Sequence, residues 1–245
     1  MSRKSDLNRY NDQVVQRTGA KERADINEGL RAYMLGIYNY MALGVALTGT
    51  VAFLAASSMD LMRAIYTNTA LSLVVMFAPL AFVLFLSFRI NHMKASTAQA
   101  LFWVYSAMMG LSLSFIFLAY TGTSIARVFF ITSGTFAAMS LYGYTTKKDL
   151  TGLGSFLFMG LIGIIIASLV NMFIGSTVME FVISVIGVLI FTGLTAYDTQ
   201  QIKHEYFYGG SSEEMKKRSI MGALRLYLDF INLFLMLLRL FGDRR

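Results

Sequence analysis

The stretch "SIMGALRLYLDFINLFLMLLRLF", residues 219–241, decides the fold class of this chain. A helix needs roughly 20 largely apolar residues to cross the hydrocarbon core of a bilayer, and this stretch is long and apolar enough to do so. It also carries a polar stripe, because Arg225, Asp229, Asn232 and Arg239 recur at spacings of four, three and seven, which is one helical face. A charged face is costly against lipid, so we expect this helix to be surrounded by other helices.

Six further apolar runs of similar length precede this one. The chain is 56% hydrophobic and only 14% charged, a balance that is unusual for a soluble domain. We therefore predict an all-α integral membrane protein with seven transmembrane helices, in which helix 7 is central and enclosed by helices 1 to 6. Residues 1–30 form a polar cytoplasmic tail and residues 31–245 the transmembrane domain. The six preceding runs are 31–56, 69–90, 97–120, 125–145, 154–175 and 180–201.

Composition also excludes several kinds of chemistry. The chain has no cysteine, which excludes disulfides, thiolate metal sites and a cysteine nucleophile. Its two histidines, His92 and His204, leave little for a metal centre. The net charge of +7 comes from bases in the tail and in short connections rather than on one amphipathic face, so we expect a lipid bilayer and no nucleic acid as partner.

The distribution of Lys and Arg predicts the orientation in the membrane. The tail, the turns at 89–94 and 147–148 and the loop at 203–218 are all basic and all fall on one side, which the positive-inside rule places in the cytoplasm. The first 30 residues lack the apolar core of a secretory signal, so we expect the tail to remain. Arg239, Arg244 and Arg245 oppose this rule at the carboxyl end. The last helix either crosses despite them or dips in and returns.

Three local patterns predict details of individual helices. "DINE", residues 25–28, has the form of a capping box and indicates the start of the first helix. Pro79, the one proline, removes a backbone donor in mid-helix and indicates a bend, either merely tolerated or a possible hinge. Small residues at four-residue spacing around Gly134 and Gly163 permit close helix contact.

Two acidic residues fall inside the last two apolar runs. Asp198 lies in "FTGLTAYDTQQIKHEYFYG", residues 191–209, and an aspartate at mid-membrane depth costs at least ~2.5 kcal/mol and is normally turned inward. If the sixth helix continues past Lys203 to Gly209, Asp198 lies roughly 16 Å from its end, and Asp229 lies roughly 15 Å from a start near Ser219. The two carboxylates then reach similar depth. Thr195, Asp198 and Gln201 should face the seventh helix.

Two carboxylates that meet in a poorly hydrated place cannot both stay ionised cheaply, so they share a proton and act as a pH sensor. The protonated pair clasps the two helices, whereas the deprotonated pair repels, binds a cation such as calcium, or recruits a base. Arg225 is the nearest base in sequence, and Arg89 at the end of the second helix is a possible latch. A structural ion pair between Arg225 and Asp229, with Asp198 at the membrane surface, is the alternative.

"AYDTQQIKH", residues 196–204, followed by "LYLDFINLFLMLLRLFG", residues 226–242, resembles the signature of the Bax inhibitor-1 family in its bacterial form. The resemblance covers all seven helices and leaves the tail of residues 1–24 outside. It implies helix 7 enclosed by the other six, and a pH-dependent calcium leak at the aspartates that match Asp198 and Asp229, which are the candidate ligands for the ion. It also implies the bacterial inner membrane. Arg225, one turn before Asp229, departs from the family pattern and would weaken a cation site.

Two other functions compete with this hypothesis. Paired aspartates on adjacent helices also describe intramembrane aspartyl proteases, but "LYLDF" lacks their glycine and no proline follows Pro79. The other is a regulator that acts through membrane-protein partners without transport, a function that would leave few recognisable motifs in the sequence. A retinal protein is excluded because the seventh helix has no lysine. We predict no enzyme activity and no cofactor, with calcium and protons as the ligands.

Overall fold

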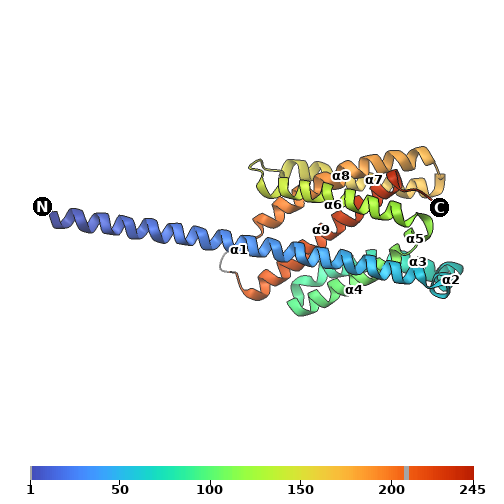
Figure 1. Cartoon of the computed structure of the whole chain (residues 1–245), viewed down its shortest axis with the longest axis horizontal. Helices are drawn as coiled ribbons and strands as arrows, with labels where there is room; N and C mark the ends of the chain where they lie inside the picture. The colour runs from blue at the N-terminus through green and yellow to red at the C-terminus, as the bar shows by residue number, and fades with distance from the viewer. Residues whose placement is uncertain (1, 207–209) are drawn as a thin grey trace.

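The computed structural model describes the backbone of residues 2–206 and 210–245, and the side chains of residues 26–90, 92–206 and 210–245. The elongated molecule is built from helices, and its first helix projects far beyond the bundle (Figure 1). The helical elements are α1 (Ser2–Ser57), α2 (Met59–Thr67), α3 (Thr69–Arg89), η1 (Ile90–His92), α4 (Ala95–Leu113), α5 (Ile116–Ala119), α6 (Gly122–Thr145), α7 (Thr151–Ile174), α8 (Thr177–His204) and α9 (Ser212–Phe241).

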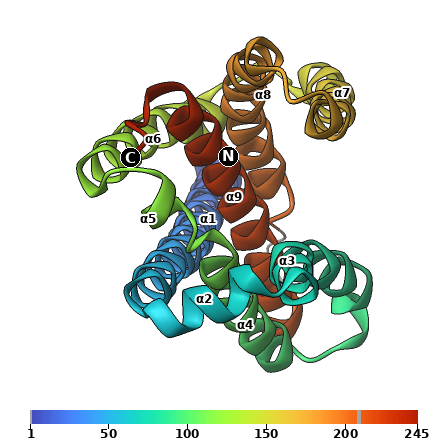
Figure 2. The same ribbon diagram turned by 90° about the vertical axis from the view of Figure 1, so that its right-hand side faces the viewer.

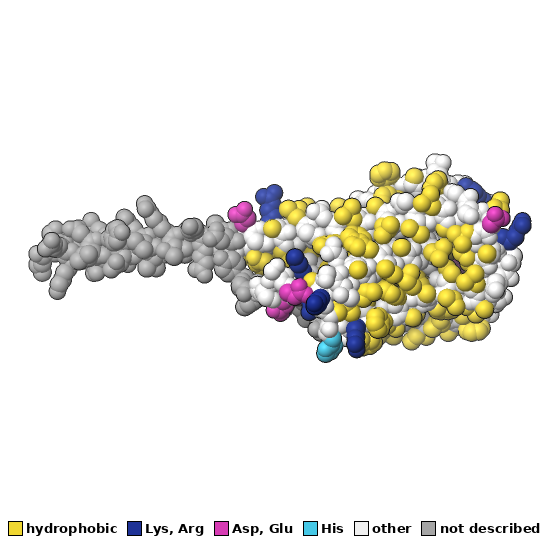
Figure 3. Space-filling model, turned by 90° about the horizontal axis from the view of Figure 1, so that it is seen from below, with side chains coloured by type: hydrophobic (Ala, Val, Ile, Leu, Met, Phe, Trp, Pro, Cys, Tyr) yellow, Lys and Arg dark blue, Asp and Glu magenta, His cyan; other side chains and the backbone are white. Residues whose placement is uncertain are grey.

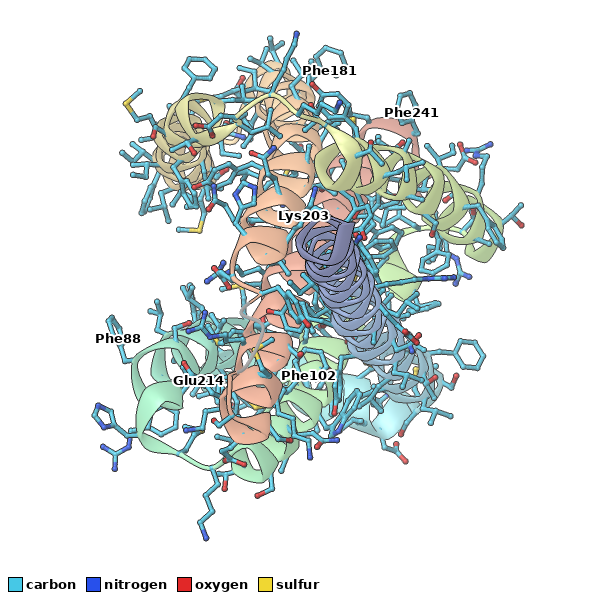
Figure 4. All side chains as sticks on the ribbon, turned by 90° about the vertical axis from the view of Figure 1, so that its left-hand side faces the viewer. Phe88, Phe102, Phe181, Lys203, Glu214 and Phe241 are labelled. Atoms are coloured by element: carbon cyan, nitrogen blue, oxygen red, sulfur yellow. The ribbon has the colours of Figure 1, made fainter. Side chains whose placement is uncertain are left out.

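The predicted seven membrane spans are confirmed. Within the described residues, 7 segments are long and apolar enough to cross a bilayer. On the face in Figure 3, hydrophobic side chains cover the middle of the bundle and charged side chains gather toward its two ends. Phe88 and Phe181 lie on the outer surface, while Phe102 is buried in the core (Figure 4). The spans are Ile26–Ser57, Thr69–Arg89, Ala95–Ala119, Gly122–Thr145, Thr151–Ile174, Thr177–His204 and Ser212–Phe241.

The last span is the most buried of the seven. In its most apolar window 72% of the residues are buried, against 11% in α3 and in α7. α9 packs chiefly against α8, α1, α6 and α4, whereas α3 packs on α4 and α7 on α8 (Figure 2). The enclosure of this helix by all six others stays a prediction.

The first helix does not begin where the sequence predicted. α1 runs without a break from Ser2 to Ser57, so "DINE" lies inside a helix and the predicted cap at Asp25 is wrong. The residues before it contain no proline and a single glycine, Gly19, so nothing in the backbone chemistry stops the helix there. The division into a tail of residues 1–30 and a membrane domain of residues 31–245 stays a prediction.

The helix that carries Asp198, α8, is shorter than predicted. α8 ends at His204, and Gly209 lies outside the described residues. The Glu205 N–H donates to the Gln201 carbonyl at 2.9 Å, and the Tyr206 N–H then closes a tighter turn on Lys203 at 3.4 Å. Such tightening is common where a helix ends.

α9 begins at Ser212, earlier than the predicted start near Ser219. The Ser211 hydroxyl accepts a hydrogen bond from the Glu214 N–H at 3.2 Å, and this bond caps the first turn of α9. Glu213 and Glu214 lie in this turn, where their negative charges interact favourably with the helix dipole. The helix therefore starts at a capping serine outside the apolar run.

The last helix crosses the bundle and does not return. The Thr121 N–H donates to the Asp243 carbonyl, and the Arg245 N–H donates to the Ala119 carbonyl, both at 3.0 Å. These bonds hold the carboxyl end at the opposite end of the bundle from the base of the projecting α1 (Figure 1). This settles the side on which the chain ends relative to its beginning.

Ion pairs at this end of the bundle compensate arginines that the predicted orientation places on the side where the positive-inside rule disfavours them. Arg244 pairs with Glu180 at 2.9 Å, and Arg127 pairs with Asp243 at 3.1 Å. Each of these two bases is therefore neutralised locally by a carboxylate. Arg239 lies in the last turn of α9.

Candidate functional site

The two aspartates occupy one site. Asp198 on α8 and Asp229 on α9 are 9% and 5% exposed, and their carboxyl groups lie side by side, close enough for a hydrogen bond if one carries a proton. The structure therefore places the carboxyl groups of Asp198 and Asp229 at a similar height along the bundle, as predicted. The α8–α9 contact is the most extensive helix contact in the bundle, and it fixes the two carboxyl groups relative to each other.

The carboxyl pair lies in the wall of a cavity of about 950 Å³. α8 and α9 supply its polar wall, and α3 and α7 supply apolar side chains on either side. The predicted stripe on α9 faces this cavity as a unit. α8 adds Asp198 and Gln201 to the polar lining, and Glu205 joins them from just beyond the end of α8. The residues of the stripe that line it are Arg225, Asp229, Asn232 and Arg239.

The hydrogen bonding of Asp229 is incomplete. Its Oδ2 atom is buried and has no hydrogen-bond partner among the described residues. A buried carboxylate oxygen without a partner is strongly disfavoured, so this atom requires a proton, a cation or water. The pair is therefore suited to exchanging one of these ligands for another.

The oxygen set suits a passing calcium ion better than a resident one. Calcium takes six to eight oxygen ligands, and the pair supplies at most four carboxylate oxygens. Asn232 and Gln201 line the same cavity and can add amide oxygens, while the Asn232 amide N–H donates to the Leu228 carbonyl at 2.9 Å. No cluster of three metal-ligating side chains occurs among the residues described here.

The predicted alternative, an ion pair between Arg225 and Asp229, is not what the structure forms. Arg225 Nη1 instead lies 2.6 Å from Glu205 Oε1, just beyond the end of α8. The Arg218 guanidinium donates to the Glu205 carbonyl oxygen at 2.9 Å and so holds this residue in place. Arg225 thus has its own carboxylate partner, and the ion pairs within the described chain leave Asp198 and Asp229 out.

The Arg225–Glu205 pair separates two cavities. Both side chains line the aspartate cavity and also a second, more polar cavity of about 690 Å³ at the end of the bundle where the α8–α9 loop lies. Lys217 and Glu214 are among the charged residues of this second cavity. Sequence reasoning missed Glu205, because this residue lies beyond the apolar run, in the basic loop at 203–218.

Three other residues singled out by the sequence do not line this cavity. Thr195 is fully buried, but its hydroxyl donates to the Phe191 carbonyl at 2.8 Å and it does not line the cavity. Arg89 is exposed at the end of α3 and forms no ion pair within the described residues, so its role as a latch stays a prediction. Pro79 is buried inside α3, which continues through it as one helix, and its role as a hinge also stays a prediction.

A family model matches residues 30–245 of the chain. Its description is "Inhibitor of apoptosis-promoting Bax1". The chain belongs to the Bax inhibitor-1 family. The match covers both aspartates, six spans in full and the first span from residue 30 onward, so the resemblance on the two motifs around Asp198 and Asp229 is confirmed.

Bacterial members of the Bax inhibitor-1 family are similar to the chain over nearly their whole length. The protein RP147 of Rickettsia prowazekii is 52% identical over 93% of this chain and 96% of its own. Inner membrane protein YbhL of Escherichia coli is 50% identical over 89% of this chain and 94% of its own. A membrane protein of Streptococcus pyogenes serotype M1 is 38% identical over 87% of this chain and 93% of its own.

Proposed function

We propose that this protein is a pH-sensitive leak pathway for cations in the bacterial inner membrane, with calcium as the favoured ion. The observation that supports this most is the buried carboxyl pair, Asp198 and Asp229, in a cavity between helices, with one carboxylate oxygen lacking a protein partner. The name of the Escherichia coli relative supports the inner membrane. The basic connections near residues 89–94 and 147–148 support a cytoplasmic amino terminus.

The chemistry of the pair makes protons and calcium competitors. With one proton, the two carboxyl groups form a hydrogen bond that joins α8 to α9. Without it, two negative charges stand close together and attract a divalent cation. Because calcium binds the deprotonated oxygens, its affinity falls as pH falls and its binding releases protons. The site carries no bond-making step, and we assign the protein no enzyme activity.

The Arg225–Glu205 pair supplies a closure for this pathway. It stands between the aspartate cavity and the polar cavity at the end of the bundle, and its guanidinium places a positive charge on the route of a cation. Movement of this ion pair opens the route and removes the charge barrier. Arg225, a departure from the family pattern, thus serves as part of the closure, and Glu205 prevents it from neutralising the aspartates.

Calcium flux into dye-loaded liposomes tests the proposal. Asp198→Asn and Asp229→Asn should each reduce the flux at least tenfold and flatten its dependence on pH. Asp149→Asn is the matched control, since Asp149 lies in the turn between α6 and α7, away from the cavity. Hydrogen bonds from the Thr151 side chain and backbone lower the pKa of Asp149, so this control also removes one negative charge.

Other outcomes of this experiment distinguish the competing functions. A flux that ignores pH and is unchanged in both cavity variants contradicts the mechanism. Cleavage of an added membrane peptide that either change abolishes would instead indicate an aspartyl protease.

A second candidate function is a regulator that acts on membrane-protein partners without transport. The description of the matching family names the inhibition of a cell-death factor, which favours this candidate. The absence of calcium flux at every pH tested, in correctly folded protein, would favour it over the leak pathway.

A further inference from the structure

A long groove lies between α1 and α6, on a different side of α9 from the carboxyl pair. α1 packs on α4 and α9, and α6 packs on α8 and α9, so these two helices stand apart with α9 between them. Phe136 of α6 and Phe230 of α9 line the groove, and the hydroxyls of Tyr38 and Ser140 bridge its two walls at 2.6 Å. Its volume is about 640 Å³, within the usual range for a ligand pocket.

The groove has the length of one leaflet of a bilayer. Along α1 it runs from Arg31 to Ala46, which is about 22 Å at the rise of an α-helix. Half of a bilayer, headgroups included, measures about 20–22 Å. At its inner end the groove meets a smaller, uncharged cavity of about 280 Å³, with Phe129 and Phe230 lining both. The wide part therefore covers one leaflet and ends near the middle of the membrane.

The outer end of the groove is basic. Arg31 is exposed, lines the groove, and has no carboxylate within ion-pairing distance among the described residues. Across from it, Tyr144 also lines the groove, and Lys203 Nζ donates to the Tyr144 carbonyl at 2.8 Å. Lys147 and Lys148 follow in the next turn. A cation at the headgroup level and an apolar channel beneath it match the two parts of an anionic phospholipid.

We propose that this groove binds an anionic phospholipid, with one acyl chain along α1 and α6 and the phosphate at Arg31. Small side chains such as Ala42, Ser133 and Ala137 give the walls the concavity that an acyl chain requires. The basic end selects negative headgroups, because each nearby Lys or Arg is worth about 1 kcal/mol toward an anionic surface. The inference stands independently of ion transport.

Native mass spectrometry of the full-length protein, released from nanodiscs of phosphatidylglycerol or phosphatidylcholine, tests the site. The wild type should retain phosphatidylglycerol in preference to phosphatidylcholine. Arg31→Ala should weaken this retention about fivefold, and Ala137→Trp should abolish it by filling the channel. The matched controls are Arg89→Ala, an exposed arginine outside the groove, and Ile166→Trp on the exposed face of α7.

Two results would overturn the inference. Ala137→Trp that keeps its lipid shows that the channel is not the site. If both lipids are retained equally and Arg31→Ala changes nothing, the retained lipid is non-specific bulk lipid carried over from the nanodisc. Arg31→Ala alters an exposed side chain, so its result is interpretable even if the tryptophan variant does not fold.

Discussion

At the scale of single residues, the candidate site consists of two carboxyl groups, Asp198 and Asp229, with the Arg225–Glu205 ion pair in the wall of the same cavity. Asp198 and Asp229 could be predicted because a carboxylate inside an apolar run is unusual whatever the surrounding fold. Glu205 could not, because it stands in a charged loop where its partner depends on how the turn after His204 is made. Arg225 has one acid within reach in sequence, Asp229, and only the tertiary structure shows that it pairs with Glu205 instead.

Glu205→Gln should decrease calcium flux, because it frees Arg225 to pair with Asp198 and Asp229 and leaves the guanidinium charge on the route uncompensated. The pair is partly exposed, so we expect a loss of stability of no more than about 1 kcal/mol. Glu214→Gln is the control, since it breaks the exposed Arg218–Glu214 pair at the same end of the bundle. Liposome flux at fixed pH measures both variants. Equal flux in Glu205→Gln and wild type would show that Glu205 does not keep Arg225 away from the aspartates.

At the scale of helices, hydropathy predicted which segments cross the membrane, but not which of their faces meet. Gly134 and Gly163 were predicted to permit close contact, yet a methyl group at either position would meet open space. The close approaches occur elsewhere: a Cβ at Gly143 would collide with the backbone carbonyl of Ala196 on α8, and one at Gly154 would collide with the ring of Tyr197. Glycine spacing alone does not distinguish a face toward lipid from a face toward a helix.

Gly143→Ala should therefore separate α6 from α8 near the carboxyl pair and destabilise the fold by about 1–3 kcal/mol, the usual effect of overpacking. Gly134→Ala is the control on the same helix. It should be neutral or stabilise by up to about 1 kcal/mol, because alanine favours the helix and nothing obstructs it. Thermal or denaturant unfolding in detergent compares the two. A Gly143→Ala variant as stable as Gly134→Ala would contradict the close approach of α6 and α8.

At the scale of the whole molecule, the number of spans could be predicted from the lengths of the apolar runs, but the cavity could not be predicted from the sequence. A lipid chain and a protein core are equally apolar, so the sequence gives no sign that α3 and α7 stand on either side of a space lined by α8 and α9. The carboxyl end was also undecided by sequence, since its arginines oppose the orientation rule. The structure resolves this through ion pairs such as Arg244–Glu180, whose partners lie far apart along the chain.

The central claim is that the bundle brings Asp198 and Asp229 together as one site, and paired cysteines test it most directly. The chain has no cysteine, so a double variant carries only the two thiols introduced. Asp198→Cys/Asp229→Cys, treated in the membrane with a short bifunctional thiol reagent, should gain the mass of one spacer per chain. The control Ser184→Cys/Asp229→Cys should not, because Ser184 lies about 21 Å along α8 from Asp198. The shared site would be contradicted if the reagent modified the two thiols of Asp198→Cys/Asp229→Cys separately, or if it cross-linked the control variant equally well.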